Sequence, residues 1–343
     1  MVSGDPLYLR VEGHDAFAPY LASDEETLVR LGKPALLRIP GRDPARARFV
    51  SCLLHGNEDS GYRAVLRLLR RRPVFDFDVW VFIGNVRAAH QHGWFAHRYL
   101  DDQEDFNRVW GVAERTTRMR QCAAAVLQEL SGAPLEAALD IHNNTGANPP
   151  YAIVPVPTQQ AQALAATCSV MVVHWNRRAH TLMEALSALC PAVSVECGLP
   201  GIEEHHRYAE GALARFLAVE DPTTGPVPER VFELLATVHV RREVAFAFGG
   251  PLTDELDLVL AAGLDGHNFG TMPAGAVLGH VRPGADMPLV ALDMDRTDVT
   301  ARHFEVCPDG SVVATRALTP AMMVTTVQQE RRDCLFYVAR RLV

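Results

Sequence analysis

The chain has almost no lysine, no strongly basic segment and no long apolar run. Lys33 is the only lysine, so any anion-binding site has to be built from arginine. The net charge is -8 and the longest basic run covers only residues 70–72, which gives no electrostatic basis for a nucleic-acid partner. Nowhere do 18 consecutive apolar residues occur, and residues 1–10 lack the basic and apolar segments of a signal peptide. These absences predict a soluble, cytoplasmic protein that binds neither nucleic acid nor a membrane.

Paired cysteines are also lacking. The seven cysteines are scattered singly, mostly among apolar residues, and no C-x-x-C pair suggests a thiolate zinc site or a redox centre. We therefore expect buried, reduced thiols.

What the sequence does contain is the composition of a globular protein. Hydrophobic residues make up 48% of the 343 residues and charged residues 22%, close to the average for globular domains. The length suggests two domains, and a homo-oligomer is left open.

Apolar segments alternate with helical patterns in the first part of the chain. Buried strands that alternate with helices are typical of a mostly parallel or mixed sheet covered on both faces. Strands are predicted at residues 35–39, 49–54, 79–83, 137–141, 170–173 and 192–195, and helices at 62–72, 116–130 and 202–219. The interpretation is an α/β catalytic domain over residues 1–220, in which residues 1–46 form short strands and turns.

The last third of the chain has a different pattern. Residues 221–228 contain three prolines and a glycine, which is typical of a linker. Beyond them, short strand-like segments at 233–248, 277–281, 289–292 and 312–317 are separated by Gly, Pro and Asp turns. We expect a smaller β-rich domain over residues 221–343.

Two histidines and a carboxylate follow predicted strands, which is where ligands bind in open α/β sheets. His55 comes directly after one strand, and Glu58 lies three residues later at a helix start. His142 ends another strand. Two imidazoles and one carboxylate, with a fourth position left open, are a recurring ligand set of hydrolytic zinc. The alternative for Glu58 is an ordinary first-turn carboxylate that interacts with the helix dipole.

A second carboxylate, Glu196, follows the strand at residues 192–195. Metal-assisted hydrolysis needs a carboxylate that is not a ligand, because the attacking water gives up a proton and the leaving group receives one. The alternative is a buried carboxylate paired with an arginine. Arg98, Asn107 and Arg108 lie on one segment, and guanidinium groups there are suited to a substrate carboxylate or a developing oxyanion; an ordinary solvated turn is the alternative.

The order of these segments resembles the succinylglutamate desuccinylase and aspartoacylase family, itself similar to zinc carboxypeptidases. The segments are His-Gly-Asn-Glu (55–58), Arg-Tyr-Leu (98–100), Asp-Phe-Asn-Arg (105–108), Asp-Ile-His-Asn-Asn-Thr-Gly (140–146) and Val-Glu-Cys-Gly (195–198). The match spans residues 49–201, and the β-rich remainder looks like the family's second domain.

The resemblance implies a role for each of these residues. His55, Glu58 and His142 correspond to the ligands of one Zn²⁺ per chain, and Glu196 corresponds to the catalytic general base and acid. Arg98 corresponds to the arginine that polarises the scissile carbonyl. Asn107 and Arg108 correspond to the pair that holds a substrate carboxylate.

Together with these residues, the resemblance implies a zinc-dependent hydrolase that cleaves the amide bond of an N-acyl amino acid or a similar small carboxylated amide. One alternative is a carboxypeptidase-like enzyme that acts on short peptides. Another is a non-catalytic binding protein on the same fold, which would have no need of Glu196. Residues 101–105 are unusually acidic and work against a strongly anionic substrate unless they fold away from the cleft.

Overall fold

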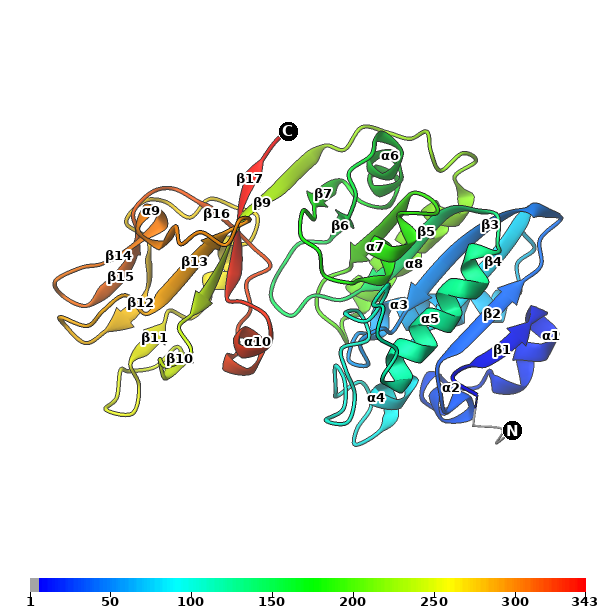
Figure 1. The fold of residues 1–343 in the computed structure, drawn as a ribbon, viewed down its shortest axis with the longest axis horizontal. Coiled ribbons are helices and arrows are strands. Elements are labelled where there is room, and N and C mark those ends of the chain that lie inside the picture. Colours follow the sequence, from blue (N-terminus) through cyan, green and yellow to red (C-terminus); the bar gives the residue numbers. More distant parts are fainter. Residues whose placement is uncertain (1–5) are drawn as a thin grey trace. The chain divides into compact units, whose positions relative to one another are not determined.

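The computed structural model describes residues 6–343, which divide into two units. Unit 1 comprises Met1–Asn143 and Pro150–Glu229, and unit 2 comprises Asn144–Pro149 and Arg230–Val343 (Figure 1). The linker predicted at residues 221–228 lies at the end of unit 1. The short segment that belongs to unit 2 begins two residues after His142, and nothing in the sequence pattern indicated it.

Unit 1 is built from alternating strands and helices. Its elements are β1 (Leu9–Glu12), α1 (Gly13–Phe17), η1 (Ala18–Tyr20), α2 (Asp24–Leu31), β2 (Ala35–Ile39), β3 (Asp43–Cys52), α3 (Asp59–Arg71), β4 (Phe77–Ile83), α4 (Val86–His90), α5 (Arg118–Ser131), β5 (Leu135–His142), β6 (Tyr151–Val154), α6 (Gln159–Cys168), β7 (Met171–His174), α7 (Leu182–Leu186), β8 (Ala192–Glu196) and α8 (Glu203–Ala218).

The strands of unit 1 form one mixed sheet in the order β1-β2-β4-β3-β5-β8-β6-β7. The central strands β4, β3, β5 and β8 are parallel, whereas β2 runs antiparallel to β4 and β6 runs antiparallel to β8. The predicted fold class, a mostly parallel or mixed sheet flanked by helices, is confirmed.

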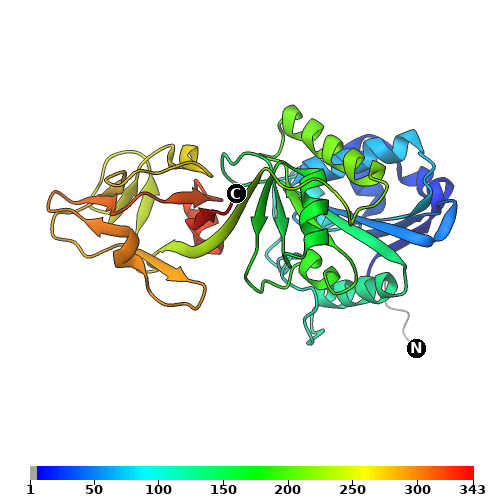
Figure 2. The same cartoon turned by 90° about the horizontal axis from the view of Figure 1, so that it is seen from above.

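Both faces of this sheet are buried, which explains the nearly continuous apolar strands. Val50 and Cys52 of β3 pack in a cluster with side chains of α2, α3, α6 and α8. Phe49, on the opposite face of the same strand, packs in a second cluster with side chains of α5 and α7. The sheet therefore lies between two helical layers (Figures 1 and 2).

Unit 2 has two groups of strands and a core of its own. Its elements are β9 (Arg230–Val240), β10 (Phe246–Phe248), β11 (Leu258–Leu260), η2 (Leu264–His267), β12 (Val277–Val281), β13 (Leu289–Asp293), α9 (Thr300–His303), β14 (Phe304–Val306), β15 (Ser311–Ala314), β16 (Thr319–Ala321), α10 (Val327–Arg332) and β17 (Phe336–Arg341). Strands β13 and β17 flank β9, and β16 pairs with β17. A five-stranded sheet has the order β10-β11-β12-β15-β14. The strand pairs of this unit are antiparallel except for the parallel pair β10 and β11. The prediction of a smaller β-rich part is confirmed.

Two details of the sequence prediction were wrong. Within residues 1–46, α2 is a helix rather than strands and turns. Ser23 accepts a hydrogen bond from the Glu26 N–H, acidic residues fill the first turn, and Gly32 ends the helix with a φ of 63°. The predicted strand at 233–248 is two strands, β9 and β10. Among the described residues, no helix combines the length and the apolar character that a membrane span needs.

Candidate active site

The turn after β3 brings His55 and Glu58 together. Leu53 leaves the strand with a φ of 59°, and the Glu58 N–H donates to the carbonyl of His55 (3.2 Å). Gly56 is required between them, because a Cβ there would lie 2.6 Å from the carbonyl carbon of Ala88. Helix α3 then begins at Asp59. The turn therefore points an imidazole and a carboxylate at one place.

His142 and Glu196 are neighbours at the same edge of the sheet. They are the last residues of β5 and β8, and their Cα atoms are register partners in this parallel pair. Strand β3 lies on the other side of β5. Because parallel strands end at a common edge, the sheet places all three strand ends side by side.

The carboxylate of Glu58 lies between the two imidazoles. Its Oε1 is 2.7 Å from Nδ1 of His55, and its Oε2 is 2.7 Å from Nδ1 of His142. One ligand atom from each of the three residues lies within 4.8 Å of the others, and the residues are only 3–4% exposed. The predicted ligands thus converge on one buried point.

The second nitrogen of each ring is held by another carboxylate. His55 Nε2 lies 3.0 Å from Oδ1 of Asp105, and His142 Nε2 lies 2.6 Å from Oδ2 of Asp140. Carboxylates that bind the Nε2 atoms leave each Nδ1 as the nitrogen for a metal ion, which is how second carboxylates orient metal-binding histidines. Ser51 in turn donates to the other oxygen of Asp140 (2.7 Å). The donor set therefore fits Zn²⁺.

The electrostatics of the cluster favour a cation. Burial lowers the pKa of His142, but Asp140 and Glu58 outweigh it and raise that pKa well above the usual value. Burial raises the pKa of Glu58, and the charges of His55 and His142 lower it overall. Protons and a metal ion therefore compete for the same negative environment.

The pKa of Glu196 is raised, in contrast to that of Glu58. Burial raises the pKa of its carboxyl group to about 8, with Glu58 and Asp140 also raising it and His142 and Arg98 lowering it. A carboxyl group with a pKa in this range can accept and return a proton near neutral pH. It stands beside the predicted ligands without belonging to their group.

Arg98 lies against this cluster. Its Nε and Nη2 atoms are 3.0 and 2.9 Å from Oδ2 of Asp105, and its Nη1 atom is 3.6 Å from Oε1 of Glu58. Burial raises the pKa of Asp105, but His55 and Arg98 lower it well below the usual value. Asp105 therefore joins a predicted ligand and Arg98 through one ionised carboxylate.

Asn107 and Arg108 follow Asp105 closely in the same loop. The amide oxygen of Asn107 accepts from the Leu182 N–H (2.9 Å), and its Nδ2 approaches His142 Nε2 to 3.3 Å. The same nitrogen lies closer to Oδ2 of Asp140 (2.6 Å), so the carboxylate is its stronger partner. Arg108 donates to the carbonyl of Asn107 (2.8 Å) and is half-buried. Both residues are thus brought beside the cluster.

Three of the four acidic residues in the segment 101–105 are paired with arginines. Arg87 binds the exposed Asp102, and Arg120 Nη2 lies 2.7 Å from Oε1 of Glu104. Asp105 binds Arg98, as described above. The negative charge of this segment is therefore largely compensated.

Sequence reasoning missed the roles of Asp105 and Asp140. Asp140 precedes His142 by two residues in one strand, so both side chains lie on the same face, and this spacing was a usable signal. Asp105 is in a loop, where no periodicity predicts which way a side chain points.

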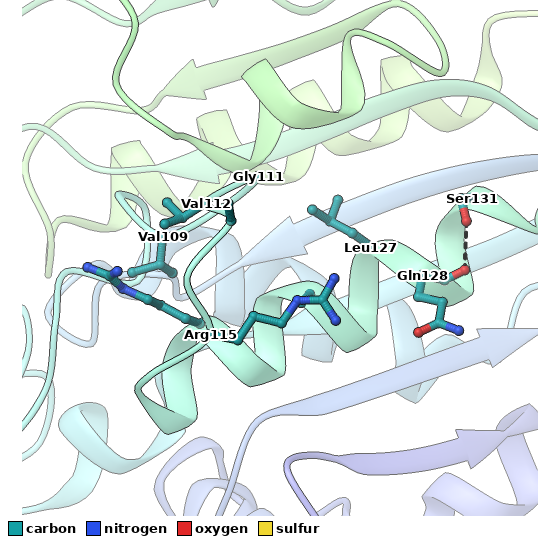
Figure 3. Close-up of a pocket in the computed structure, with 10 residues that line it drawn as sticks. Val109, Gly111, Val112, Arg115, Leu127, Gln128 and Ser131 are labelled. Carbon is teal, nitrogen blue, oxygen red and sulfur yellow. Dashed lines mark hydrogen bonds between the residues drawn. The ribbon is translucent and has the colours of Figure 1, made fainter.

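An open pocket lies elsewhere in unit 1. It has a volume of about 450 Å³ and is formed by the loop after Arg108 and by α5 (Figure 3). Its lining is Val109, Gly111, Val112, Ala113, Arg115, Arg120, Ala124, Leu127, Gln128 and Ser131. None of the predicted site residues lines it.

Comparison with known proteins places this arrangement in a family. Residues 44–220, about half of the chain, match the succinylglutamate desuccinylase/aspartoacylase catalytic domain. The chain belongs to this family. Membership in a family of deacylating enzymes supports a hydrolase activity, and it confirms the resemblance noted in the sequence. No curated protein matches the chain.

Solved structures of family members share the fold. A succinylglutamate desuccinylase/aspartoacylase from Rhodobacter sphaeroides has a TM-score of 0.59 at 15% identity and covers 90% of this chain and 89% of its own. Murine aminoacylase 3 has a TM-score of 0.53 at 14% identity, with 88% and 97% covered. A succinylglutamate desuccinylase from Silicibacter sp. has a TM-score of 0.56 at 12% identity, with 89% and 88% covered. At these identities the likeness concerns the fold.

Proposed function

We propose that the protein is a zinc-dependent hydrolase that cleaves the amide bond of an N-acyl amino acid or a similar small carboxylated amide. One observation carries the proposal. Two Nδ1 atoms face the Glu58 carboxylate while Asp105 and Asp140 hold the opposite nitrogens. The names of the family members, a desuccinylase and an aminoacylase among them, agree with this class of substrate.

His55, Glu58 and His142 would hold the ion. Zinc at such a site supplies a Lewis acid for the amide carbonyl and makes water nucleophilic near neutral pH. The other contributions come from the chain itself.

Glu196 accepts a proton from the attacking water on its carboxylate and returns the proton to the leaving amine. In the metal-free protein burial raises its pKa to about 8, so this carboxyl group can hold a proton near neutral pH. Arg98 directs a guanidinium at the carbonyl oxygen as charge develops there. Its contact with Asp105 restricts the orientation of that group.

Arg108 and the amide hydrogens of Asn107 bind the carboxylate of the substrate. A planar guanidinium binds a carboxylate through two parallel hydrogen bonds. With residues 102, 104 and 105 paired to arginines, the local charge does not oppose an anionic substrate.

The test is a hydrolysis assay with zinc-loaded protein on a panel of N-acyl amino acids. The panel includes the same compounds with the carboxylate amidated, and short peptides. We expect about one equivalent of zinc per chain, release of the free amino acid, and reversible loss of activity on chelation. Full activity after exhaustive chelation would refute the zinc assignment, and preferential cleavage of peptides would favour a carboxypeptidase-like enzyme.

A further inference from the structure

Asn143, the residue after β5, makes four hydrogen bonds and is 3% exposed. Its backbone N–H donates to Oε2 of Glu58 (3.2 Å). Its side-chain oxygen accepts from the Ser60 N–H (3.0 Å), and its Nδ2 donates to the Ser60 hydroxyl (2.9 Å) and to the carbonyl of Gly198 (2.8 Å). The buried amide is thus fully used.

These partners come from three adjacent strand ends. Glu58 and Ser60 follow β3, Asn143 follows β5, and Gly198 follows β8. In the sheet the order of these strands is β3-β5-β8. Asn143 therefore connects the turn that carries a predicted metal ligand with the turn that directly follows Glu196.

The turn after Glu196 is shaped to receive this bond. Gly198 has a φ of 96°, and a Cβ there would lie 2.6 Å from the ring of His205. The Cys197 N–H donates to the carbonyl of His142 (3.0 Å). Further along, the Gly201 N–H donates to Oδ1 of Asp59 (3.0 Å). Both this bond and the bond from Asn143 tie the turn to residues near the start of α3. The bond from the Asn143 side chain is at Gly198, two residues after Glu196, whereas the bond to Asp59 is at Gly201.

We propose that Asn143 is a positioning residue that sets the place of the Glu196 carboxylate relative to the predicted metal ligands. The inference rests on the proposed function of Glu196. The two halves of Asn143 have separate tasks. The backbone N–H orients Glu58 whatever the side chain is, whereas the amide fixes the turn at Gly198.

The test variant is Asn143→Ala, which keeps the hydrogen bond to Glu58 and removes the bonds to Ser60 and Gly198. Ser60→Ala is the matched control, because it removes one hydrogen bond from the same cluster and keeps the bond to Gly198. A displaced general base lowers kcat, so we expect kcat to fall by about 10- to 100-fold in Asn143→Ala, with KM and zinc affinity nearly unchanged. Ser60→Ala should retain the wild-type values.

Two further measurements are independent of turnover. Zinc affinity is measured by competition with a chelator, and backbone hydrogen exchange is followed in residues 197–201. Exchange in this turn should become faster in Asn143→Ala and not in Ser60→Ala. Asn143→Ser should give an intermediate result, because its shorter hydroxyl cannot reach both Ser60 and Gly198, and it serves if Asn143→Ala does not fold.

The outcomes separate the two ideas. Unchanged kcat, or a kcat that falls only in parallel with zinc affinity, would overturn the positioning role. Unchanged exchange in residues 197–201 would also overturn it. If the wild-type protein hydrolyses no member of the panel, the proposed function fails, while the exchange experiment still tests whether Asn143 holds the turn.

Discussion

The substitution Glu196→Gln separates catalysis from metal binding. The amide has nearly the shape of the carboxylate but cannot accept the proton from water. A general acid and base contributes about 10²- to 10⁴-fold to a rate, so we expect kcat to fall by about that factor. Zinc content should stay at the wild-type level, because Glu196 is outside the group formed by His55, Glu58 and His142.

The same substitution should stabilise the metal-free protein at high pH. Burial raises the pKa of Glu196 from 4.5 to about 8. A carboxyl whose pKa is higher in the folded than in the unfolded state makes folding less favourable as the pH rises between these two values. At about 1.4 kcal/mol per pKa unit, the cost is on the order of 5 kcal/mol above pH 8. The amide introduced by Glu196→Gln is neutral at every pH and avoids this cost.

The assay is urea denaturation of chelated wild-type and Glu196→Gln proteins from pH 4 to pH 9. The free energies of unfolding of the two proteins should coincide near pH 4. The difference in favour of Glu196→Gln should then increase steadily up to about pH 8. Glu204→Gln, on the exposed surface of α8, is the control for the amide substitution itself. A difference in the free energy of unfolding between wild type and Glu196→Gln that does not depend on pH would refute the reasoning. Loss of zinc in Glu196→Gln would indicate that Glu196 is a ligand.

Three other substitutions test the remaining groups. Arg108→Ala should lower kcat/KM by about 10- to 150-fold on carboxylated substrates, since a charge-assisted hydrogen bond contributes about 1.5–3 kcal/mol. Arg108→Lys should restore only part of the lost kcat/KM. Equal cleavage of carboxylated and amidated substrates by the wild type would contradict this role. Asp140→Asn should weaken zinc binding by about 10- to 100-fold in a chelator competition, and an unchanged affinity would exclude an orienting role for Asp140. Arg48→Met should lower the free energy of unfolding by about 2–4 kcal/mol, because the buried guanidinium donates to the carbonyls of Phe216 and Val219 at the end of α8 (2.7 and 2.6 Å); a urea midpoint equal to that of the wild type would contradict it.

The central strands β3, β4, β5 and β8 could be predicted because each contains a compact apolar segment. The strand predicted at 79–83 is β4, which begins two residues earlier, and the one at 137–141 is β5, which begins two residues earlier and ends one residue later. Shorter elements gave weaker signals. Strand β6 has four residues, and α6 consists largely of small residues with little contrast between its faces, so neither was predicted.

The position of the candidate site could be predicted for a physical reason. His142 and Glu196 each end an apolar strand, and parallel strands share the edge at which they end. The residues that orient the site are different, because their role depends on contacts between elements. Asn143 acts through Ser60 and Gly198, which are 83 and 55 residues away. No local pattern contains that information.

The acidic segment 101–105 shows how composition misleads when pairing is ignored. Taken as free charges, these residues oppose an anionic substrate beside Arg108. In the structure, Asp102 and Glu104 bind Arg87 and Arg120, which come from α4 and α5. The partners are 15 and 16 residues distant and lie on opposite sides of the segment in sequence. Because Lys33 is the only lysine, every one of these pairs is made with a guanidinium group, which can bind both oxygens of a carboxylate. A substrate carboxylate at Arg108 therefore meets a largely neutralised loop, and the acid that contacts the site, Asp105, is already occupied by His55 and Arg98.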